Sequence, residues 1–178
     1  MIRSAIAATI LAVLPATAQA GPEAEAVIAE AASEIAGGPG HTSALMDKID
    51  VEAIAHFVLG RHSRDLSEKD RSDFTNAFRQ FLDAAIRRQA GEFSDAQVDI
   101  LGSFDRNGRD SIVQSIVSDG AGNTAMVRWR LAKRGEAWRV VDLQVEGLWL
   151  SIELRAQISA ILGNPGASIA DAIEALDG

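Results

Sequence analysis

The strongest constraint on the fold is a change in the spacing of apolar residues about halfway along this 178-residue chain. From Phe74 to Ile86 the apolar residues recur at helical spacing, which predicts a long helix that ends near Gly91. From Ala96 onward they alternate with polar residues, in segments separated by turn-forming pairs such as Asn107-Gly108. The second pattern predicts four consecutive antiparallel strands, over residues 98–101, 111–117, 124–131 and 138–145.

Shorter helical patterns lie on both sides of these two regions. One helix is expected before the breaker Gly37–Gly40, and the next from a cap at Asp50 to Gly60. Ser67–Asp70 resembles a capping box at the start of the long helix. Two more helices are expected after the strands, over residues 150–162 and 168–176. Helices gathered on one face of an antiparallel sheet predict an α+β domain.

The pairing of the last two strands has two alternatives. A two-residue turn after Arg134 places five apolar side chains on one face, namely Val127, Trp129, Leu131, Trp138 and Val140. A longer loop pairs Val127 and Trp129 with Leu143 and Val141 instead. The sequence leaves both registers open, because a shift of one residue exchanges the two faces of a strand.

The first twenty residues have the pattern of a secretory signal peptide. Arg3 precedes an apolar run that ends at Leu14, and Ala18-Gln19-Ala20 is a small-x-small cleavage site. The run is too short to remain in a bilayer as a spanning helix. We therefore predict that residues 1–20 are removed and that residues 21–178 form a single soluble domain outside the cytoplasm.

Composition excludes several classes of function. The formal net charge is −8 and no polybasic cluster is present, so nucleic acid is not an expected partner. The absence of Cys excludes disulfides, thiolate metal sites and a Cys nucleophile. His41, His56 and His62 do not have the spacing of metal ligands, so we expect neither a metal nor another cofactor. The aliphatic residues predict an interior that is stabilised by packing alone.

Two carboxylates and two arginines are candidates for a polar site. Asp142 and Glu146 lie near the end of a predicted strand, where a general base sits in cone-shaped α+β isomerases. Such enzymes also need a phenolic or protonated-acid donor, and this chain has no Tyr. Arg61 and Arg64 are placed to bind a phosphate or to form a structural ion pair with one of these carboxylates. A small cavity enzyme that uses Asp142 or Glu146 is therefore an alternative function.

Two segments carry a resemblance to a known family. They are residues 54–64, IAHFVLGRHSR, and residues 138–150, WRVVDLQVEGLWL. In this order, with the same intervening helix and strands, they resemble the MlaC family, also called the toluene-tolerance auxiliary component of an ABC transporter. The likeness runs from about Ala24 to Leu176 and implies a curved sheet that forms a cone with its helices, as in NTF2-like folds.

The resemblance also implies a function and partners. MlaC proteins are periplasmic carriers without catalytic activity that hold phospholipid acyl chains in an apolar pocket and leave the headgroup near solvent. They shuttle lipid between an inner-membrane ABC transporter complex with an MCE-domain subunit and an outer-membrane lipoprotein complex, and so support outer-membrane asymmetry. We expect the same of this chain, as a monomer.

The resemblance makes the long-helix stripe and a face of the sheet candidate pocket walls. The expected lipid-binding residues are Ile54, Phe57, Val58, Phe74, Phe78, Phe81, Leu82, Ile86, Val127, Trp129, Val141, Leu143, Val145, Leu148, Leu150, Leu154 and Ile158, with Arg61 and Arg64 as headgroup candidates. The family tends to have an aromatic pair where His62 and Ser63 stand, and often a Tyr near Ala85 or Ile86. Because these changes remove aromatic bulk, a hopanoid or another lipid is the alternative cargo.

Overall fold

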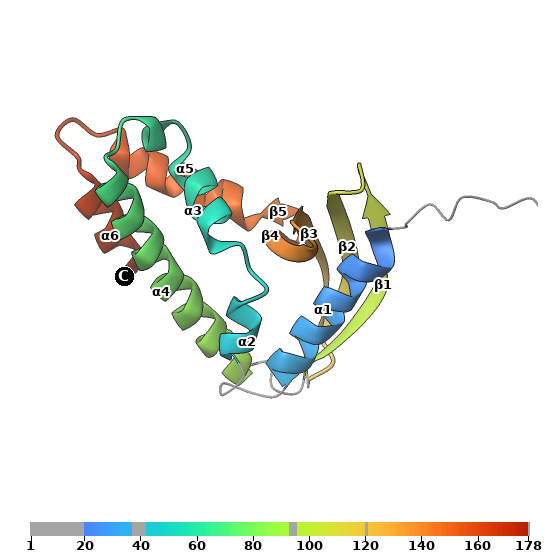
Figure 1. Cartoon of the computed structure of the whole chain (residues 1–178). Helices are drawn as coiled ribbons and strands as arrows, with labels where there is room; N and C mark the ends of the chain where they lie inside the picture. Colours follow the sequence, from blue (N-terminus) through green and yellow to red (C-terminus); the bar gives the residue numbers. More distant parts are fainter. Residues whose placement is uncertain (1–19, 37–41, 93–95, 120, 178) are drawn as a thin grey trace, which may run out of the picture.

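The computed structural model describes residues 20–36, 42–92, 96–119 and 121–177. Their elements follow in the order α1 (Ala20–Ala36), α2 (Thr42–Met46), α3 (Val51–Leu59), the 3-10 helix η2 (Gly60–Arg64), α4 (Glu68–Glu92), β1 (Gln97–Asp105), β2 (Asp110–Ser118), β3 (Thr124–Arg134), β4 (Ala137–Val145), β5 (Leu148–Trp149), α5 (Leu150–Leu162) and α6 (Ile169–Asp177) (Figure 1). The expected signal peptide apart from Ala20, the breaker Gly37–Gly40 and His41 lie outside the described residues.

The sheet is antiparallel and its strands are neighbours in sequence order, from β1 to β5. The predicted α+β class is confirmed, but the sheet has five strands where the sequence predicted four. The fifth strand, β5, pairs Leu148 with Val145 and Trp149 with Gln144, and it runs directly into α5. Two residues are too few to produce a visible alternation, so the sequence predicts no element at Leu148 and Trp149.

A β-bulge combines the two registers that the sequence left open. At the turn end Leu131 pairs with Val140, as a two-residue turn requires. The register then shifts, so that further along Trp129 pairs with Leu143 and Val127 with Val145. The extra residue is Val141, which leaves Val140 and Leu143 on the same face of the sheet.

The helix boundaries follow the predicted caps. The Asp50 carboxylate accepts a hydrogen bond of 3.0 Å from the Ala53 N–H, and Ser67 Oγ accepts one of 3.1 Å from the Asp70 N–H. Gly60 ends α3 with a φ of +54°, and a Cβ at this position would lie 2.7 Å from Arg155 Nε. The corner between α3 and η2 therefore needs glycine both for its backbone and for the approach of α5.

The buried apolar residues of the described chain fall into two clusters. The first, which we call the helical layer, joins α3, α4, α5 and α6 around the fully buried rings of Phe74 and Phe78. The second, the sheet layer, packs α1 on one face of the sheet through Ile28, Val113 and Leu131. Figure 1 shows the two layers diverging, with α4 and α6 on one side and α1 with the sheet on the other.

The two layers meet around Ile49, which packs against both clusters. The Asp50 N–H donates to the Val140 carbonyl and the Val140 N–H donates to the Lys48 carbonyl, each at 2.9 Å. The chain between α2 and α3 is thereby held against β4. In the described part of the chain, no helix has the length and apolar character that crossing a membrane requires.

Candidate functional site

The helical layer holds the predicted lipid-binding residues that come from helices. Those that are buried within its core are Ile54, Val58, Phe74, Phe78 and Ile158. Those that pack against this core and stay partly exposed are Phe81, Leu82, Ile86 and Leu154. Phe57 is 41% exposed, and its ring lies under the Arg155 guanidinium at 5.0 Å. The first group stabilises the fold itself, so the partly exposed group is the one that offers apolar surface to a ligand.

The sheet layer holds the remaining predicted residues. Val127, Trp129, Leu143 and Val145 share one face according to the observed register, and Val141 is the bulge residue. Val127 is buried, whereas Trp129, Leu143 and Val145 are partly exposed. Leu148 on β5 and Leu150 at the start of α5 are 58% and 42% exposed. These residues form a second apolar surface beside the part of the face that α1 covers.

Trp129 has a fixed orientation on this surface. Its Nε1–H donates a hydrogen bond of 2.9 Å to Ser115 Oγ, and Ser115 is completely buried on the neighbouring strand. The indole also packs against the α1 cluster. Because the hydrogen bond satisfies the indole N–H, the ring can lie in an apolar environment. Trp129 therefore marks the boundary between the covered and the uncovered part of the face.

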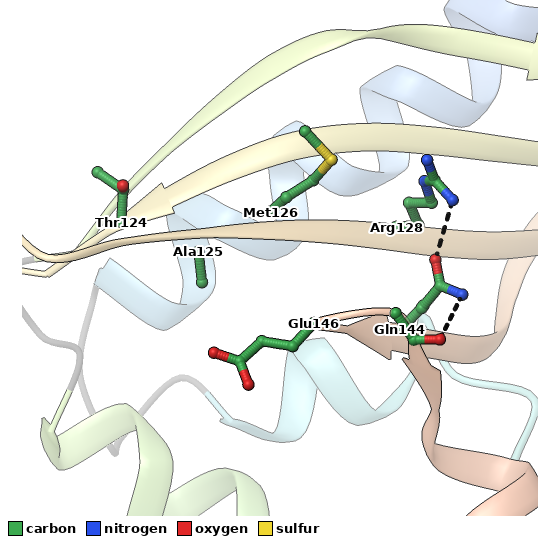
Figure 2. A pocket seen from close by; sticks show the side chains of 7 residues that line it. Thr124, Ala125, Met126, Arg128, Gln144 and Glu146 are labelled. Atoms are coloured by element: carbon green, nitrogen blue, oxygen red, sulfur yellow. Dashed lines mark hydrogen bonds between the residues drawn. The ribbon is translucent and has the colours of Figure 1, made fainter.

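A hollow of about 380 Å³ lies where β3 begins and β4 ends (Figure 2). Its lining residues are Thr124, Ala125, Met126, Arg128, Gln144, Glu146 and Gly147. Ala125 lies on the same face as Val127, whereas Met126 and Arg128 alternate to the opposite face. The hollow thus lies at the edge where the apolar face ends, and both faces contribute to it.

Two opposite charges line this hollow without pairing with each other. The Arg128 side chain donates a hydrogen bond of 3.2 Å from Nη1 to Gln144 Oε1, and Gln144 Nε2 donates one of 3.1 Å to the Gly147 carbonyl. Arg128 Nε is buried and has no hydrogen-bond partner among the described residues. Glu146 has a φ of +51°, and Figure 2 shows its carboxylate pointing away from Arg128.

Asp142 has a structural role in the sheet layer. Its Oδ1 accepts hydrogen bonds from the backbone N–H groups of Leu143 and Ser151, at 2.8 and 3.1 Å, and its Oδ2 accepts one from the Ser151 hydroxyl. These bonds satisfy a free N–H at the start of α5. Asp142 does not line the hollow, whereas Glu146 does. Of the two carboxylates that the sequence proposed as a general base, only Glu146 faces a hollow.

Arg61 and Arg64 lie on η2 with exposed side chains. Among the residues that the structure describes, neither forms an ion pair with Asp142 or Glu146. The structural ion pair that the sequence offered as one role for these arginines is therefore not observed there. The physical reason for Asp142 is that Ser151 already occupies both of its oxygens. Binding of a headgroup by Arg61 and Arg64 stays a prediction.

The other arginine on this part of β3 already has a partner. Arg130 makes two hydrogen bonds to Asp110 on β2, of 3.2 and 2.9 Å, and this carboxylate raises the pKa of Arg130 above its ordinary value. Among the described residues, the hydrogen-bond partner of Arg128, two residues away, is the neutral amide of Gln144. The difference leaves Arg128 as the cation that is free to meet an anion in the hollow.

Comparison with known proteins identifies the family. The sequence profile described as "MlaC protein" matches residues 41–177. The chain belongs to the MlaC family. A solved structure with the same fold is the phospholipid-binding protein from Ralstonia solanacearum in complex with a phospholipid, which superposes with a TM-score of 0.72 at 19% identity over 87% of this chain and 95% of that chain. No curated protein sequence matches this chain.

Most residues of the hollow carry no signal in the sequence. Thr124, Met126, Arg128 and Gln144 were not singled out, because each is an ordinary polar or apolar residue within an alternating strand. One signal was available at Glu146-Gly147. A Gly in the second position of a two-residue loop that follows an alternating strand is typical of a tight hairpin, and such a hairpin brings the end of β4 close to β5.

Proposed function

We propose that this chain is a periplasmic carrier that binds the acyl chains of a phospholipid between its sheet layer and its helical layer. In this proposal the carrier shuttles lipid between an inner-membrane ABC transporter complex with an MCE-domain subunit and an outer-membrane lipoprotein complex, and it performs no chemistry on its cargo. Membership of the MlaC family supports the proposal. The phospholipid in the structural neighbour from Ralstonia solanacearum supports it independently.

One observation on this chain carries the proposal. A domain of this size usually has one contiguous core, but the apolar residues described here form two clusters that meet around Ile49. Beside that junction Trp129, Leu143 and Val145 remain partly exposed on the sheet, and Phe81, Leu82 and Ile86 remain partly exposed on α4. An apolar ligand between the layers would cover both surfaces and complete the core.

The energetics favour a carrier over free diffusion of the lipid. A two-chain phospholipid has roughly 30 methylenes, and burial of each one is worth about 0.8 kcal/mol, so the tails cannot stay in water during transit. Aliphatic and aromatic side chains accept such tails without leaving polar groups unpaired. The free energy of apolar burial depends on the buried area and requires no particular orientation of the groups. The protein should therefore discriminate weakly between tails of similar length.

The decisive experiment is to isolate the protein from a bacterial periplasm without detergent and to analyse it by native mass spectrometry and solvent extraction. We expect one phospholipid per chain. Protein that is folded and carries no lipid would contradict the proposal. A hopanoid in place of a phospholipid would keep the carrier function and correct the cargo.

A substitution on the sheet locates the tails. Leu143→Asp places a charge on the partly exposed apolar face, so we expect a folded protein that has lost most of its lipid. Leu101→Asp is the matched control, because Leu101 is 54% exposed at the bulge of β1, which β2 and β3 separate from Leu143 on β4. Equal lipid content in the two variants would show that the tails do not contact Leu143.

A further inference from the structure

We propose that α1 is a lid on the sheet, which lifts at its N-terminal end and admits acyl chains of the cargo to the apolar face beneath it. The inference rests on the proposed function for the identity of the cargo. It adds to the tail site the part of the face that α1 covers in the closed structure, and it assigns to α1 the control of access to that part. Figure 1 shows α1 lying against the sheet and apart from α4 and α6.

The first argument is that the covered and the uncovered parts belong to one apolar face. Val113 pairs with Trp129, and Trp129 pairs with Leu143. Val113 is completely buried in the α1 cluster, Trp129 packs against that cluster, and Leu143 is partly exposed. Leu131 and Val140, which pair with each other, extend the covered part. A tail on the uncovered part therefore reaches the edge of α1 at Trp129 without leaving the face.

The second argument is the small apolar contact that α1 makes. Its buried apolar residues are Ala24, Ile28 and Ala31, of which two are alanines. The face beneath it contributes two completely buried serines, Ser111 and Ser115. Because apolar stabilisation increases with the buried area, these small side chains stabilise their contact less than the buried phenylalanine rings stabilise the helical layer. We therefore expect α1 to open more readily than the helices of that layer.

The third argument is a buried hydroxyl that lacks a partner. Ser111 shares the covered face with Val113, which lies two residues further along β2. The Ser111 Oγ is buried and has no hydrogen-bond partner among the described residues. Such a hydroxyl destabilises the closed arrangement, and water satisfies it once the helix has moved away. Ser111 therefore favours opening of the face on which it lies.

The fourth argument is the way in which α1 is fastened. The side-chain contacts are those of Glu23 with Trp138 and Lys133, of Glu25 with Ser103, and of Glu30 with Lys48. Among the described residues no backbone hydrogen bond joins α1 to the sheet, and exposed ion pairs contribute little to stability because water competes for them. Glu30 lies in the C-terminal half, and the carbonyl of its partner Lys48 is bonded to β4. That half is the fixed one, so the lid lifts at the other end.

The first test measures opening without any lipid. The chain has no cysteine, so a single one can be introduced beneath the lid as Val113→Cys. Val58→Cys is the matched control, because Val58 is equally buried but lies in the helical layer. We expect a thiol reagent to modify Val113→Cys at least about tenfold faster under native conditions, because a lid opens without global unfolding. Equal rates would overturn the lid.

An added Ser111→Ala substitution tests the cause of the opening. It removes the unpaired hydroxyl from the closed form, so it should slow the modification of Val113→Cys by roughly threefold or more. An unchanged rate would count against the lid, because the closed form would then carry no cost at that hydroxyl.

The second test locks the lid with a disulfide. A Cβ at Gly21 would lie 3.8 Å from the Ser103 Cβ, which is a separation typical of disulfides. Gly21→Cys combined with Ser103→Cys, oxidised with glutathione disulfide, should therefore bridge the N-terminal end of α1 to β1. Intact mass before and after reduction confirms the bridge.

Lipid uptake is then compared in the bridged and the reduced form of this double variant. The lipid-free protein is mixed with vesicles of phosphatidylethanolamine and phosphatidylglycerol, and native mass spectrometry follows the bound lipid over time. We expect the bridged form to load at least about tenfold more slowly than the reduced form, because only the open lid admits the tails. Wild type with and without reductant is the control, since it has no cysteine.

The outcomes separate the lid from the carrier. Fast modification of Val113→Cys together with uptake that depends on the bridge supports the proposal. Equal uptake by the bridged and the reduced form would overturn it and leave the carrier intact. A wild-type protein that takes up no lipid would contradict the carrier and with it the admission of tails, while the modification of Val113→Cys would still decide whether α1 opens.

Discussion

The helical layer and the sheet layer of this protein are built on different principles. In the helical layer Phe74 and Phe78 of α4 are fully buried, with ring centroids 6.0 Å apart, in a cluster that α3, α5 and α6 complete. In the sheet layer a single helix, α1, covers part of one face, and partly exposed apolar residues remain beside it. The helical layer has an enclosed core of its own beside the partly exposed apolar residues of α4, whereas in the sheet layer the enclosed part is limited to the area under α1.

Polar contacts have a larger share in the sheet layer. Trp129 donates its indole N–H to the completely buried Ser115 on β2, and Trp138 donates its indole N–H to Glu23. Such contacts fix the orientation of a ring but contribute less to stability than full apolar burial. Substitutions should therefore have large effects in the helical layer and smaller effects in the sheet layer.

The largest effect is expected from Phe78→Ala. The ring is fully buried between Phe74 and Phe81, so its removal should lower the free energy of unfolding by about 3–5 kcal/mol, measured by urea denaturation. Phe57→Ala is the control, because Phe57 is 41% exposed and should lose much less. A similar loss in both variants would show that the enclosed rings of Phe74 and Phe78 are not the main source of stability in the helical layer.

Gly60→Ala should destabilise the same layer by a smaller amount. The φ of +54° alone costs about 1–3 kcal/mol for Ala, and the new Cβ must also displace the Arg155 guanidinium. Gly122→Ala separates the cost of the positive φ from that of the steric contact. Gly122 has a φ of +87°, but no atom lies within 4 Å of a Cβ added there. Thermal unfolding should rank Gly60→Ala as the more harmful change, and equal shifts would mean that Arg155 adjusts without cost.

In the sheet layer Ser115→Ala tests the hydrogen bond that orients Trp129. Loss of the acceptor should lower the free energy of unfolding by about 0.5–1.5 kcal/mol, measured by urea denaturation and tryptophan fluorescence. Ser111→Ala is an unusually close control, because the Ser111 hydroxyl is equally buried and has no partner among the described residues. Removal of that hydroxyl should be neutral or stabilising, and a reversed order would refute the assigned roles.

The smallest expected effect is the pH dependence of the contact between α1 and the sheet. Glu23 Oε2 accepts hydrogen bonds from Trp138 Nε1 and Lys133 Nζ, and these contacts hold the pKa of Glu23 below its ordinary value. A lowered pKa stabilises the fold above the unfolded-state pKa, and this contribution disappears as the pH falls through the folded-state pKa. Glu23→Gln should therefore flatten the acid limb of a stability profile measured by urea denaturation.

Glu153→Gln provides the control for that profile, because Glu153 is exposed on α5 in the other layer. Its acid limb should match that of wild type. An acid limb that Glu23→Gln leaves unchanged would show that α1 is held by its apolar contacts alone.

The sequence predicted local structure well wherever one interaction dominates. The stripe from Phe74 to Ile86 identified α4, and the side chains of Asp50 and Ser67 identified helix starts, because each signal lies within a few neighbouring residues. The bulge at Val141 was not predictable, since it depends on the pairing of two strands and not on the composition of either. It decides which residues share the apolar face.

The candidate site was predicted only in part, because its shape also depends on contacts between distant segments. The sequence found the apolar residues, but not that Phe74 and Phe78 are enclosed while Leu143 and Val145 stay accessible. That distinction depends on how far apart the two layers stand, which no local pattern encodes. The pairing of Arg130 with Asp110 likewise distinguishes it from Arg128 only in three dimensions.

The two borders of the sheet have a consequence for solubility. β1 is an outer strand whose regular pattern is interrupted between Ile100 and Gly102 and which carries charged Asp99 and Asp105. The other border, β5, is only two residues long. The bulge and charges of β1 and the short length of β5 disfavour the addition of a strand from a neighbouring molecule, which is a common route to aggregation. The chain thus keeps accessible apolar surface on the face of its sheet while its two edges resist pairing with a second copy.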